Sequence, residues 1–506
     1  MLAKVYTAAL LGLQSKIVEV EVDIQKGIHK FNIVGLADKA IQESKERVTA
    51  AIKNSNSDFI SRRITVNLAP ADLPKSGPTY DLPIAVGIIL ASNQVTYDAS
   101  KTLFVGELAL GGSVRRLQGM IAIADAAKHH GFTALFVPYE NANEASLIQG
   151  LDIFPVQNFD QLVTHLMYGD VIEKHYVSHE TLNHNEEYAY DLKHVRGQSH
   201  AKRALEIAAA GGHNVLLTGT PGSGKTLLAK TLPSFLPMMT LHESLEVTRV
   251  HSVVGLVTDT KPLVSQRPFR SPHHTTSEVA LVGGGTYPRP GEISLAHRGV
   301  LFLDEFPEYS RAALEALRQP IEDEIVTVSR ATGSLQFPAN FMLIAAMNPC
   351  KCGWYGDDDR ECTCSMLEYQ RYQKRISGPI LDRIDLQVQV HKVKYDKLLK
   401  NSNEGESSRI VRKRVQEARN KQNKRYQAIN ITANAELPQK HIASYIPLDQ
   451  ASISLLRNAV DKLQLSARSY FRIIKVSRTI ADIQGDEKVQ QHHLAEALSY
   501  RMLNES

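Results

Sequence analysis

The sequence predicts an α/β protein whose core is a parallel sheet carrying a phosphate-binding loop. Three observations lead to this prediction. One apolar run leads into the glycine-rich string Gly219-Thr-Pro-Gly-Ser-Gly-Lys-Thr226, a second ends in Asp304 and Glu305, and a third ends in Asn348. Open parallel sheets bind their ligands at the carboxyl ends of the strands, which is where these polar residues are expected.

Length and composition set the outer limits. The chain has 506 residues and a net charge of +4, so it can form two to four domains and has no overall basic or acidic bias. The N-terminus lacks the pattern of a secretory leader, and no apolar run is long enough for a membrane span. We therefore expect a cytoplasmic protein without a membrane partner.

The order of elements predicts four parts. Residues 1–170 alternate strands with helices, residues 171–190 are polar and aperiodic, residues 191–394 carry the phosphate-binding loop, and residues 395–506 are helical. We expect an independent α/β domain, a linker, a nucleotide-binding core and a helical lid.

The glycine-rich string has the chemistry of a P-loop. Successive backbone N–H groups can cradle the phosphates of ATP at a helix N-terminus, Lys225 can reach the β- and γ-phosphates, and Thr226 can ligate Mg²⁺. The alternative is a glycine turn that matches the pattern by chance. The residues expected to bind ATP are Gly219, Pro221, Gly222, Ser223, Gly224, Lys225 and Thr226.

The polar strand ends complete a hydrolytic site. Asp304 is expected to hold Mg²⁺ through water, Glu305 to polarise the attacking water, and Asn348 to sense the γ-phosphate. Arg383 and Arg468 suit the charge that develops during phosphoryl transfer. Taken alone, either arginine is more readily explained by a surface ion pair.

The order of these motifs resembles AAA+ ATPases of the helix-2-insert clade, which includes magnesium chelatase subunits and MCM helicases. Three long strings are similar to those of the magnesium-chelatase-like ComM/YifB family: Arg267-Pro-Phe-Arg-Ser-Pro-His-His274, Pro288-Arg-Pro-Gly-Glu-Ile-Ser-Leu-Ala-His-Arg-Gly299 and Ala346-Met-Asn-Pro-Cys-Lys-Cys-Gly353. The resemblance implies that Arg383 is an arginine finger acting on a neighbour's ATP and that Arg468 is a sensor 2 residue. A finger acting between subunits implies a ring, expected to be a homo-hexamer.

The first 170 residues resemble the proteolytic domain of Lon-type proteases. The similar strings are Pro74-Lys-Ser-Gly-Pro-Thr-Tyr-Asp-Leu-Pro83 and Gly106-Glu-Leu-Ala-Leu-Gly-Gly-Ser-Val114. The resemblance places Thr79 where the serine nucleophile stands and Ile121 where the lysine base stands. Isoleucine cannot accept a proton, so we expect an inactive protease fold used for binding or assembly, or one that merely caps the ring.

All four cysteines lie between Cys350 and Cys364, as two Cys-x-Cys pairs. Four thiolates favour a structural, tetrahedral Zn²⁺ site, with free thiols or an iron–sulfur cluster as alternatives. The predicted ligands are Cys350, Cys352, Cys362 and Cys364. The adjacent His273 and His274 are expected to hydrogen-bond or to face DNA rather than to bind metal.

Two insertions could contact DNA. Residues 325–337 predict a β-hairpin with Arg330 near its turn, and the glycine-rich stretch 282–291 carries Arg289. Phosphate contacts by arginine would suit a protein that binds any sequence. In the alternative, Arg330 pairs with Glu322 or Glu324 and only steadies the hairpin. The basic helix 407–426 is a third candidate, although such helices are commonly solvated faces.

The resemblance implies an ATP-driven hexameric DNA translocase that promotes branch migration during natural transformation and recombination. Its implied cofactors are ATP and Mg²⁺, and its implied partners are single-stranded or branched DNA and recombination proteins. The alternative is a chelatase-like motor that remodels a protein partner. An ATP-dependent protease is disfavoured by Ile121.

Overall fold

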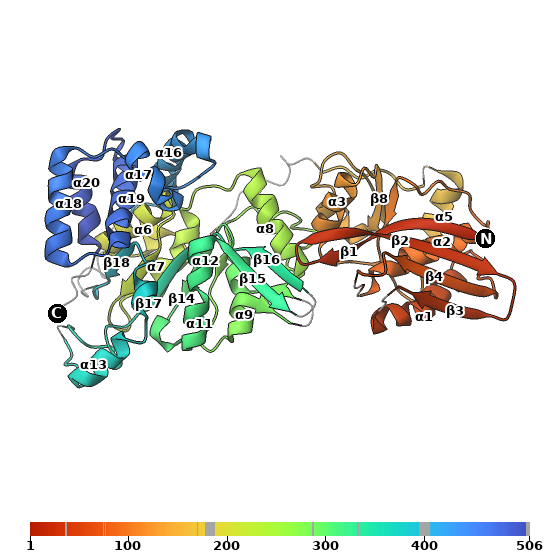
Figure 1. Cartoon of the computed structure of the whole chain (residues 1–506), viewed down its shortest axis with the longest axis horizontal. Helices are drawn as coiled ribbons and strands as arrows, with labels where there is room; N and C mark the ends of the chain where they lie inside the picture. The colour runs from red at the N-terminus through yellow and green to blue at the C-terminus, as the bar shows by residue number, and fades with distance from the viewer. Residues whose placement is uncertain are drawn as a thin grey trace. The chain divides into compact units, whose positions relative to one another are not determined.

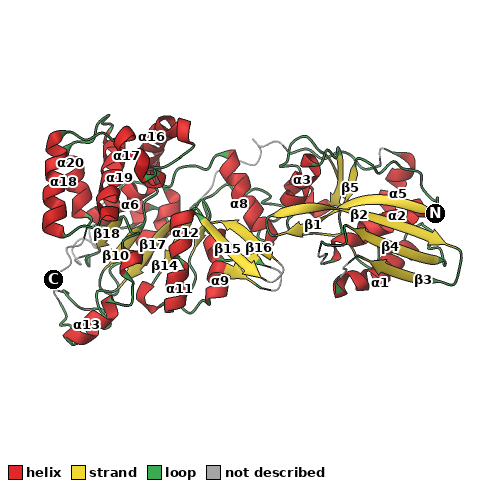
Figure 2. Ribbon diagram, in the orientation of Figure 1, coloured by secondary structure: helices red, strands yellow, loops and turns green. Residues whose placement is uncertain are grey.

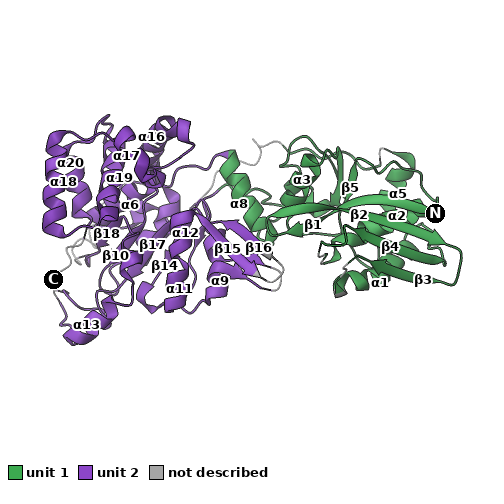
Figure 3. Cartoon of the chain, in the orientation of Figure 1, with its two compact units in different colours: residues 1–184, 241–265 green, residues 185–240, 266–506 purple. Residues whose placement is uncertain are grey.

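The computed structural model describes residues 1–35, 38–73, 75, 77–169, 171–177, 188–285, 288–330, 333–357, 359–393 and 405–501. The chain forms two compact units, shown in Figure 3. Residues 1–184 and 241–265 form the first, and residues 185–240 and 266–506 form the second. The chain therefore leaves the first unit, returns to it once and leaves it again.

The first unit is built on a seven-stranded mixed sheet in the order β3-β4-β2-β1-β5-β8-β9 (Figure 1). Antiparallel pairs join β1 to β2 and β2 to β4, and the remaining pairs are parallel. The strands are β1 (Leu2–Leu11), β2 (Gln14–Gln25), β3 (Lys30–Val34), β4 (Arg63–Ala69), β5 (Thr102–Phe104), β8 (Ala134–Pro138) and β9 (Asp152–Val156), beside a small hairpin of β6 (Glu107–Leu108) and β7 (Val114–Arg115).

Helices cover this sheet because their apolar residues face it. The helix α2 is buried along almost its whole length, as expected for one that is apolar on all sides, and a Cβ added at Gly87 would lie 2.5 Å from Val22 Cγ2 of β2. The helices are α1 (Lys39–Lys53), α2 (Asp81–Ala91), α3 (Met120–His129), α4 (Ala142–Ala145), α5 (Phe159–Tyr168) and α8 (Leu241–Val253).

The helix α8 and the loop after it belong to this first unit, although they follow the phosphate-binding loop in sequence. Arg249 forms an ion pair with Asp125 at 2.9 Å, Ser252 donates to the buried Glu144, and Asn143 donates to Asp259 at 2.8 Å. The apolar side chains of α8 at Val247, Val250 and Val253 are buried. Residues 241–265 are thus an integral part of the first unit's packing.

The structure describes only part of the predicted linker, residues 171–190. Residues 178–187 lie outside the described part of the chain, whereas residues 171–177 run beside β9. His175 donates its backbone N–H to Ile153 at 2.8 Å, and Lys174 pairs with Asp152 at 2.8 Å. The beginning of the polar segment is therefore ordered against the first unit.

The second unit is organised by a five-stranded sheet in the order β11-β14-β17-β10-β18, and all of its strand pairs are parallel. The strands are β10 (Val215–Thr218), β11 (Phe269–Arg270), β14 (Val300–Leu303), β17 (Met342–Met347) and β18 (Leu386–Gln389). Every residue of β10, β14 and β17 is buried, which is typical of a parallel sheet covered on both faces. The predicted parallel core is confirmed.

One helix, α6, precedes the first strand of this sheet, and shorter helices and two hairpins lie in the connections between its strands. The helices are α6 (Ser199–Gly211), α7 (Lys225–Thr231), α9 (Glu278–Val282), α10 (Glu292–Leu295), α11 (Arg311–Ala316), α12 (Arg318–Asp323), α13 (Met366–Gln373) and α14 (Gly378–Leu381). The hairpins are β12 (Gly283–Gly284) with β13 (Arg289–Pro290), and β15 (Ile325–Arg330) with β16 (Gly333–Pro338). The second hairpin lies where the sequence predicts it, just before β17.

The C-terminal part is helical, as Figure 2 shows. It contains α16 (Ser408–Tyr426), α17 (Gln439–Tyr445), α18 (Gln450–Leu463), α19 (Ala467–Gln484) and α20 (Gln491–Ser499). Buried apolar residues of α16 and α19 join those of α6 and the parallel sheet in one continuous core. The helical part is therefore packed firmly onto the nucleotide-binding core. None of the helices in the described ranges is long and apolar enough to cross a bilayer.

Candidate nucleotide-binding site and cysteine cluster

The phosphate-binding loop joins β10 to α7 in the left-handed geometry that glycine permits. Gly222 and Gly224 have φ angles of 77° and 91°. A Cβ built at either position would meet no heavy atom of the described residues within 4 Å, so it is the left-handed backbone rather than crowding that calls for glycine here. Gly219 is required for a different reason, because a Cβ there would lie 2.3 Å from the carbonyl oxygen of Val390.

Lys225 is held at the start of α7 by neutral oxygens. Its Nζ donates to the carbonyls of Gly219 at 2.7 Å and Thr220 at 3.0 Å, and to Asn348 Oδ1 at 3.2 Å. Burial lowers the pKa of Lys225. Within the described ranges no carboxylate lies within ion-pair distance of it. Among the described residues, the buried hydroxyl of Ser223 also has no hydrogen-bond partner. A buried ammonium and an unpaired hydroxyl beside an open loop fit a phosphate group.

The predicted Mg²⁺ ligands meet at the carboxyl end of β14. The Thr226 hydroxyl donates to Asp304 Oδ2 at 2.7 Å. Lys225 joins the same group through Asn348, which follows β17. The structure therefore brings together Lys225, Thr226, Asp304 and Asn348, from segments far apart in the sequence. Oxygen ligands of this kind suit Mg²⁺, which is bound through few protein groups together with substrate phosphates.

Glu305 directly follows Asp304 in an unusual backbone conformation. Its φ angle is 52°, in the left-handed region that non-glycine residues seldom adopt. The carboxylate is half-exposed, and His274 Nδ1 lies 2.9 Å from its Oε2. Sequence reasoning missed this contact, although it noted the two adjacent histidines. Functional sites commonly hold residues in sparsely populated conformations.

Gln198 is a second residue that the sequence analysis missed. It has a φ angle of 58°, and its side-chain amide donates to the Ser223 carbonyl at 3.1 Å and to the His391 carbonyl. This amide thus ties the phosphate-binding loop to the end of β18. A Gly-Gln pair placed just before a helix is the signal that could have found it. A cavity of about 450 Å³, a size typical of small-molecule sites, opens beside Thr218, Gly219 and Val390.

Arg383 and Arg468 lie together, and no contact among the described residues joins either of them to the phosphate-binding loop. Both pair with Glu322: Arg468 Nη2 is 3.3 Å from Oε1, and Arg383 Nη2 contacts Oε2. The Arg383 side chain is only 8% exposed and also donates to the Pro379 carbonyl at 2.7 Å, whereas Arg468 is 49% exposed. The two arginines therefore form one surface, on which Arg468 is the more accessible.

The carboxylate of Asp385 holds Arg383 in place through Arg472. Arg472 pairs with Asp385 and donates to the Arg383 carbonyl at 2.9 Å, while the backbone N–H of Asn214 donates to Asp385 Oδ2 at 3.0 Å. Burial alone would raise the pKa of Asp385. The Arg472 charge, His213 and the Asn214 N–H instead hold that pKa well below its usual range. Asp385 is thus ionised and ties β18, β10 and α19 together.

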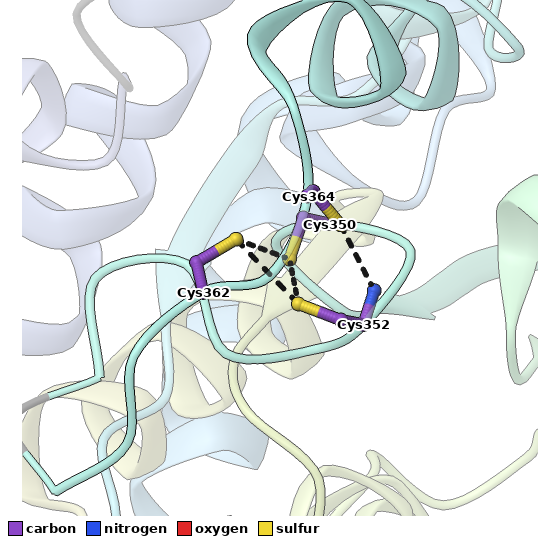
Figure 4. A group of neighbouring side chains, drawn as sticks. All are labelled: Cys350, Cys352, Cys362 and Cys364. Carbon is purple, nitrogen blue, oxygen red and sulfur yellow. Dashed lines mark hydrogen bonds between the residues drawn. The ribbon is translucent and has the colours of Figure 1, made fainter.

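The four cysteines converge as Figure 4 shows. The Sγ–Sγ distances are 3.3 Å for Cys350–Cys352, 3.5 Å for Cys352–Cys362 and 3.6 Å for Cys350–Cys362. Cys364 Sγ accepts from the backbone N–H of Cys352 at 3.4 Å, and all four sulfurs lie within 4.8 Å of one another. A Zn–S distance of about 2.3 Å places tetrahedral sulfurs roughly 3.8 Å apart. The cluster is compatible with zinc and is far too open for disulfides.

The cysteine cluster also contacts the nucleotide site. Cys350 follows Asn348 by two residues, and a Cβ added at Gly353 would lie 2.7 Å from Pro221 of the phosphate-binding loop. Burial would raise the pKa of Cys352, but the backbone N–H groups of Trp354 and Thr363 and the neighbouring thiols lower it to about 5. A thiolate, the form that binds metal, is therefore favoured here at neutral pH.

The structure describes the two arginines predicted to contact DNA to different extents. Arg289 is exposed in the β12–β13 hairpin. Arg330 ends β15, and its side chain lies outside the described residues. Glu322 is engaged by Arg383 and Arg468, and Glu324 accepts from Asn340 at 2.9 Å. The two carboxylates offered as alternative partners for Arg330 thus have other partners.

The basic helix α16 turns most of its cations inward. Arg414 pairs with Glu206 at 2.6 Å, Arg425 pairs with Asp482, and Arg412 donates to the Ser234 carbonyl at 2.9 Å. Arg409, Lys413, Lys421 and Lys424 are exposed, although Lys421 donates to the Asp482 carbonyl at 3.1 Å. Most of the basic pattern of α16 is therefore explained by packing onto the nucleotide-binding core.

In the first unit, Ile121 is fully buried in the first turn of α3. Its backbone N–H donates to Glu144 Oε1 at 3.3 Å. Thr79 lies in a short turn before α2. Its carbonyl accepts from the Gly106 N–H at 3.3 Å, and its hydroxyl has no hydrogen bond to a base within the described part of the chain. Ile121, which stands where the resemblance expects the catalytic lysine, is therefore part of the apolar core.

Comparison with known proteins agrees with the geometry. Family models described as "Magnesium chelatase, subunit ChlI", "Subunit ChlI of Mg-chelatase" and "Magnesium chelatase, subunit ChlI C-terminal" match residues 191–398, 20–141 and 405–501. The chain is 44% identical over 506 residues to "Competence protein ComM" of Haemophilus influenzae, covering 99% of this chain and 98% of that protein. The chain belongs to the ComM/YifB family. Its 42% identity to YifB of Salmonella typhimurium, over 99% of this chain and 97% of that protein, extends the family across both units.

The family assignment fixes the fold class of both parts. The second unit contains the magnesium-chelatase-like AAA+ core of the ComM/YifB family. The beginning of the chain is Lon-like, since it is 27% identical over 168 residues to Lon protease 2 of Bacillus subtilis, covering 30% of each chain. The predicted fold, an AAA+ core with a helical lid preceded by a Lon-like α/β domain, is confirmed.

Proposed function

We propose that the protein is an ATP-driven DNA translocase that works as a homo-hexameric ring and promotes branch migration of DNA. The observation that carries the proposal is the hydrogen-bonded group of Lys225, Thr226, Asp304 and Asn348 at the carboxyl edge of the parallel sheet. That group has the donors and acceptors that ATP and Mg²⁺ require. The Haemophilus relative is named a competence protein, which adds a link to competence.

Each residue has one task in hydrolysis. Lys225 neutralises the β- and γ-phosphates, and the amides of residues 219–226 orient them. Thr226 and Asp304 hold Mg²⁺, which supplies charge stabilisation to the transferring phosphoryl group. Glu305 accepts a proton from the attacking water, and Asn348 orients that water by its amide.

The place of the arginines supports the proposal of a ring. Arg383 and Arg468 share Glu322 and have no described contact with the phosphate-binding loop of their own chain. We infer that they serve the ATP of the neighbouring subunit, where a planar, permanently charged group stabilises the transition state. Mixing wild-type protein with Arg383→Ala protein tests this: a ring with shared sites should lose more activity than the fraction of variant subunits.

DNA contacts are assigned to the two insertions. Arg289 is exposed on the β12–β13 hairpin, and Arg330 stands at the end of β15. Both hairpins connect to strands that end in the nucleotide site, so nucleotide state can move them. Contacts to phosphates rather than to bases suit a translocase that must hold any sequence.

ATP hydrolysis measured with and without DNA tests the function. We expect forked or single-stranded DNA to stimulate hydrolysis, and Glu305→Gln protein to bind ATP but not to turn it over. A translocase should also displace a strand from a branched substrate in the presence of ATP. Hydrolysis that no DNA structure stimulates would refute the translocase.

The second candidate is a motor that remodels a protein partner. The observation in its favour is that all three matching family models describe a magnesium chelatase subunit. DNA-independent ATP hydrolysis would favour it. Proteolysis remains disfavoured, since Ile121 offers no base.

We also propose that Cys350, Cys352, Cys362 and Cys364 hold one structural Zn²⁺. The support is the spacing of the sulfurs, which is close to that of a tetrahedral site. A closed four-cysteine site would rigidify the loop that packs on Pro221. The role assigned to the metal is thus to brace the phosphate-binding loop and Asn348.

A further inference from the structure

The loop that joins the two Cys-x-Cys pairs carries a buried carboxylate, Asp357, which is paired with the end of β18. The Asp357 side chain is only 4% exposed, and Lys392 Nζ lies 2.9 Å from its Oδ2 and 3.1 Å from its Oδ1. Lys392 follows the last residue of β18 by three positions. The bond from Lys392 outweighs the effect of burial and lowers the pKa of Asp357, so the carboxylate is ionised at neutral pH.

The same carboxylate also reaches the phosphate-binding loop. The Thr220 hydroxyl donates to Asp357, and both residues line the cavity of about 450 Å³ beside that loop. The carbonyl of Thr220 in turn accepts from Lys225 Nζ at 3.0 Å. A single residue, Thr220, therefore links Asp357 to the ammonium group that is expected to bind the phosphates.

Part of the bonding of Asp357 serves only its own turn. Its Oδ1 accepts from the backbone N–H groups of Asp359 at 3.0 Å and Arg360 at 3.1 Å. Aspartate and asparagine both form such turns, so these two bonds need an oxygen but no negative charge. The bonds to Lys392 and Thr220 join segments far apart in the sequence, and the local turn does not explain them.

The tryptophan beside this carboxylate provides a natural probe. Trp354 is the only tryptophan of the chain. Lys392 Nζ lies 4.7 Å and Arg360 Cζ lies 4.4 Å from the centroid of its ring, at distances where a cation is attracted to the indole. The fluorescence of Trp354 should therefore change when Lys392 leaves its place.

A phosphate-binding loop binds more tightly when its free form already has the bound conformation. Gly222 and Gly224 give this loop a wide choice of backbone angles, and any freedom lost on binding weakens the affinity. Asp357 holds Thr220, near the beginning of the loop, through a charge-assisted hydrogen bond. Asp357 can thus reduce the entropy that the loop loses when it binds phosphates.

From these contacts we propose that Asp357 is a positioning residue that fastens the phosphate-binding loop to the end of β18 and thereby sets the affinity for ATP. It acts through Thr220. The inference rests on the proposed function, since it takes this loop as the ATP site. It adds a determinant of ATP affinity that depends on a buried charge and needs no metal.

The test replaces Asp357 by asparagine in the full-length protein. Asparagine keeps one oxygen for the local turn, but it removes the negative charge and one acceptor. We expect the Kd and KM for ATP to rise about tenfold and kcat to stay within about twofold of wild type. Metal content should equal that of wild type, and the Trp354 emission should shift to longer wavelength. The matched control is Asp359→Asn, whose carboxylate is 76% exposed and 3.6 Å from Lys392, and it should behave as wild type.

A double-mutant cycle tests the route through Thr220. Thr220→Val removes the hydroxyl at nearly constant volume. If Asp357 acts through this hydroxyl, protein with both changes should bind ATP about as tightly as Asp357→Asn protein alone. Factors that multiply in the double variant would show that Asp357 acts by another route.

Two further results would overturn the proposal. An unchanged Kd for ATP in Asp357→Asn protein would show that the fastening does not set the affinity. A loss of metal, kcat and ATP binding together would show that Asp357 only maintains the fold of the cysteine loop. Failure of the proposed function looks different, because Lys225→Ala protein would then bind ATP as tightly as wild type.

Discussion

Replacing Asp385 by asparagine removes the charge that anchors the arginine surface. The carboxylate is buried and pairs with Arg472, which in turn holds the Arg383 carbonyl. Breaking a buried ion pair by removing one partner costs about 3–5 kcal/mol, because the other charge stays buried and unpaired. Asparagine still offers an oxygen to the Asn214 N–H, so we expect the lower end, about 3 kcal/mol.

A thermal unfolding scan measures this loss. For a unit of this size 1 kcal/mol corresponds to roughly 2 °C, so the unfolding temperature of the second unit should fall by about 6 °C. The matched control is Asp382→Asn in the same Leu381–Asp385 string. Asp382 is only partly buried, and its described contact is a long bond of 3.5 Å from Ser466, so we expect a change of about 1 °C.

The pH dependence has a definite sign. The folded pKa of Asp385 lies below its unfolded value near 4, so the stabilisation is present above that unfolded value and is lost as the pH falls through the folded pKa. The difference between wild type and Asp385→Asn should thus stay constant from pH 5 to 8 and shrink below about pH 4. Equal effects of Asp385→Asn and Asp382→Asn would refute the reasoning.

Three further predictions follow from the nucleotide site and the insertions. Lys225→Ala should lose nucleotide binding, whereas Glu305→Gln should retain ATP and stop turnover; equal loss of binding in both would contradict their division of roles. Metal analysis should find about one zinc per chain. The Cys362→Ser protein should lose both the zinc and tight ATP binding. Wild-type protein that contains no zinc after purification without chelators would exclude the site. Arg289→Ala should weaken DNA binding equally for all sequences and lower its salt dependence by about one unit of slope, which a salt titration checks.

Much of the second unit could be predicted because local sequence determines it. The strands that end at Asp304 and Asn348 are short apolar runs, and a glycine-rich turn with Lys225 admits few conformations. These elements come together through a parallel sheet, whose strands must present their carboxyl ends on one edge. The positions of the glycine-rich loop, the strand that ends at Asn348 and the β15–β16 hairpin could therefore be predicted without a structure.

The pairings of long charged side chains could not be predicted in the same way. Glu322 was a candidate partner for Arg330 because the two are near in sequence, whereas the folded chain pairs it with Arg383 and Arg468. A flexible side chain can reach several partners, and the tertiary structure decides among them. The left-handed turn at Gln198 and the bond from His274 to Glu305 likewise depend on segments that the sequence does not show to be adjacent.

The return of residues 241–265 to the first unit limits how this protein can be divided. Cutting the chain near residue 185 would give an ATPase fragment that still carries α8, now without the partners that bury Val247, Val250 and Val253. Removing α8 as well would cut the ATPase sequence between α7 and β11. A Lon-like domain joined only at one end could be gained, lost or exchanged by a single recombination event. Here the two units share an interleaved stretch of chain, so they can be inherited, expressed and truncated cleanly only as a pair.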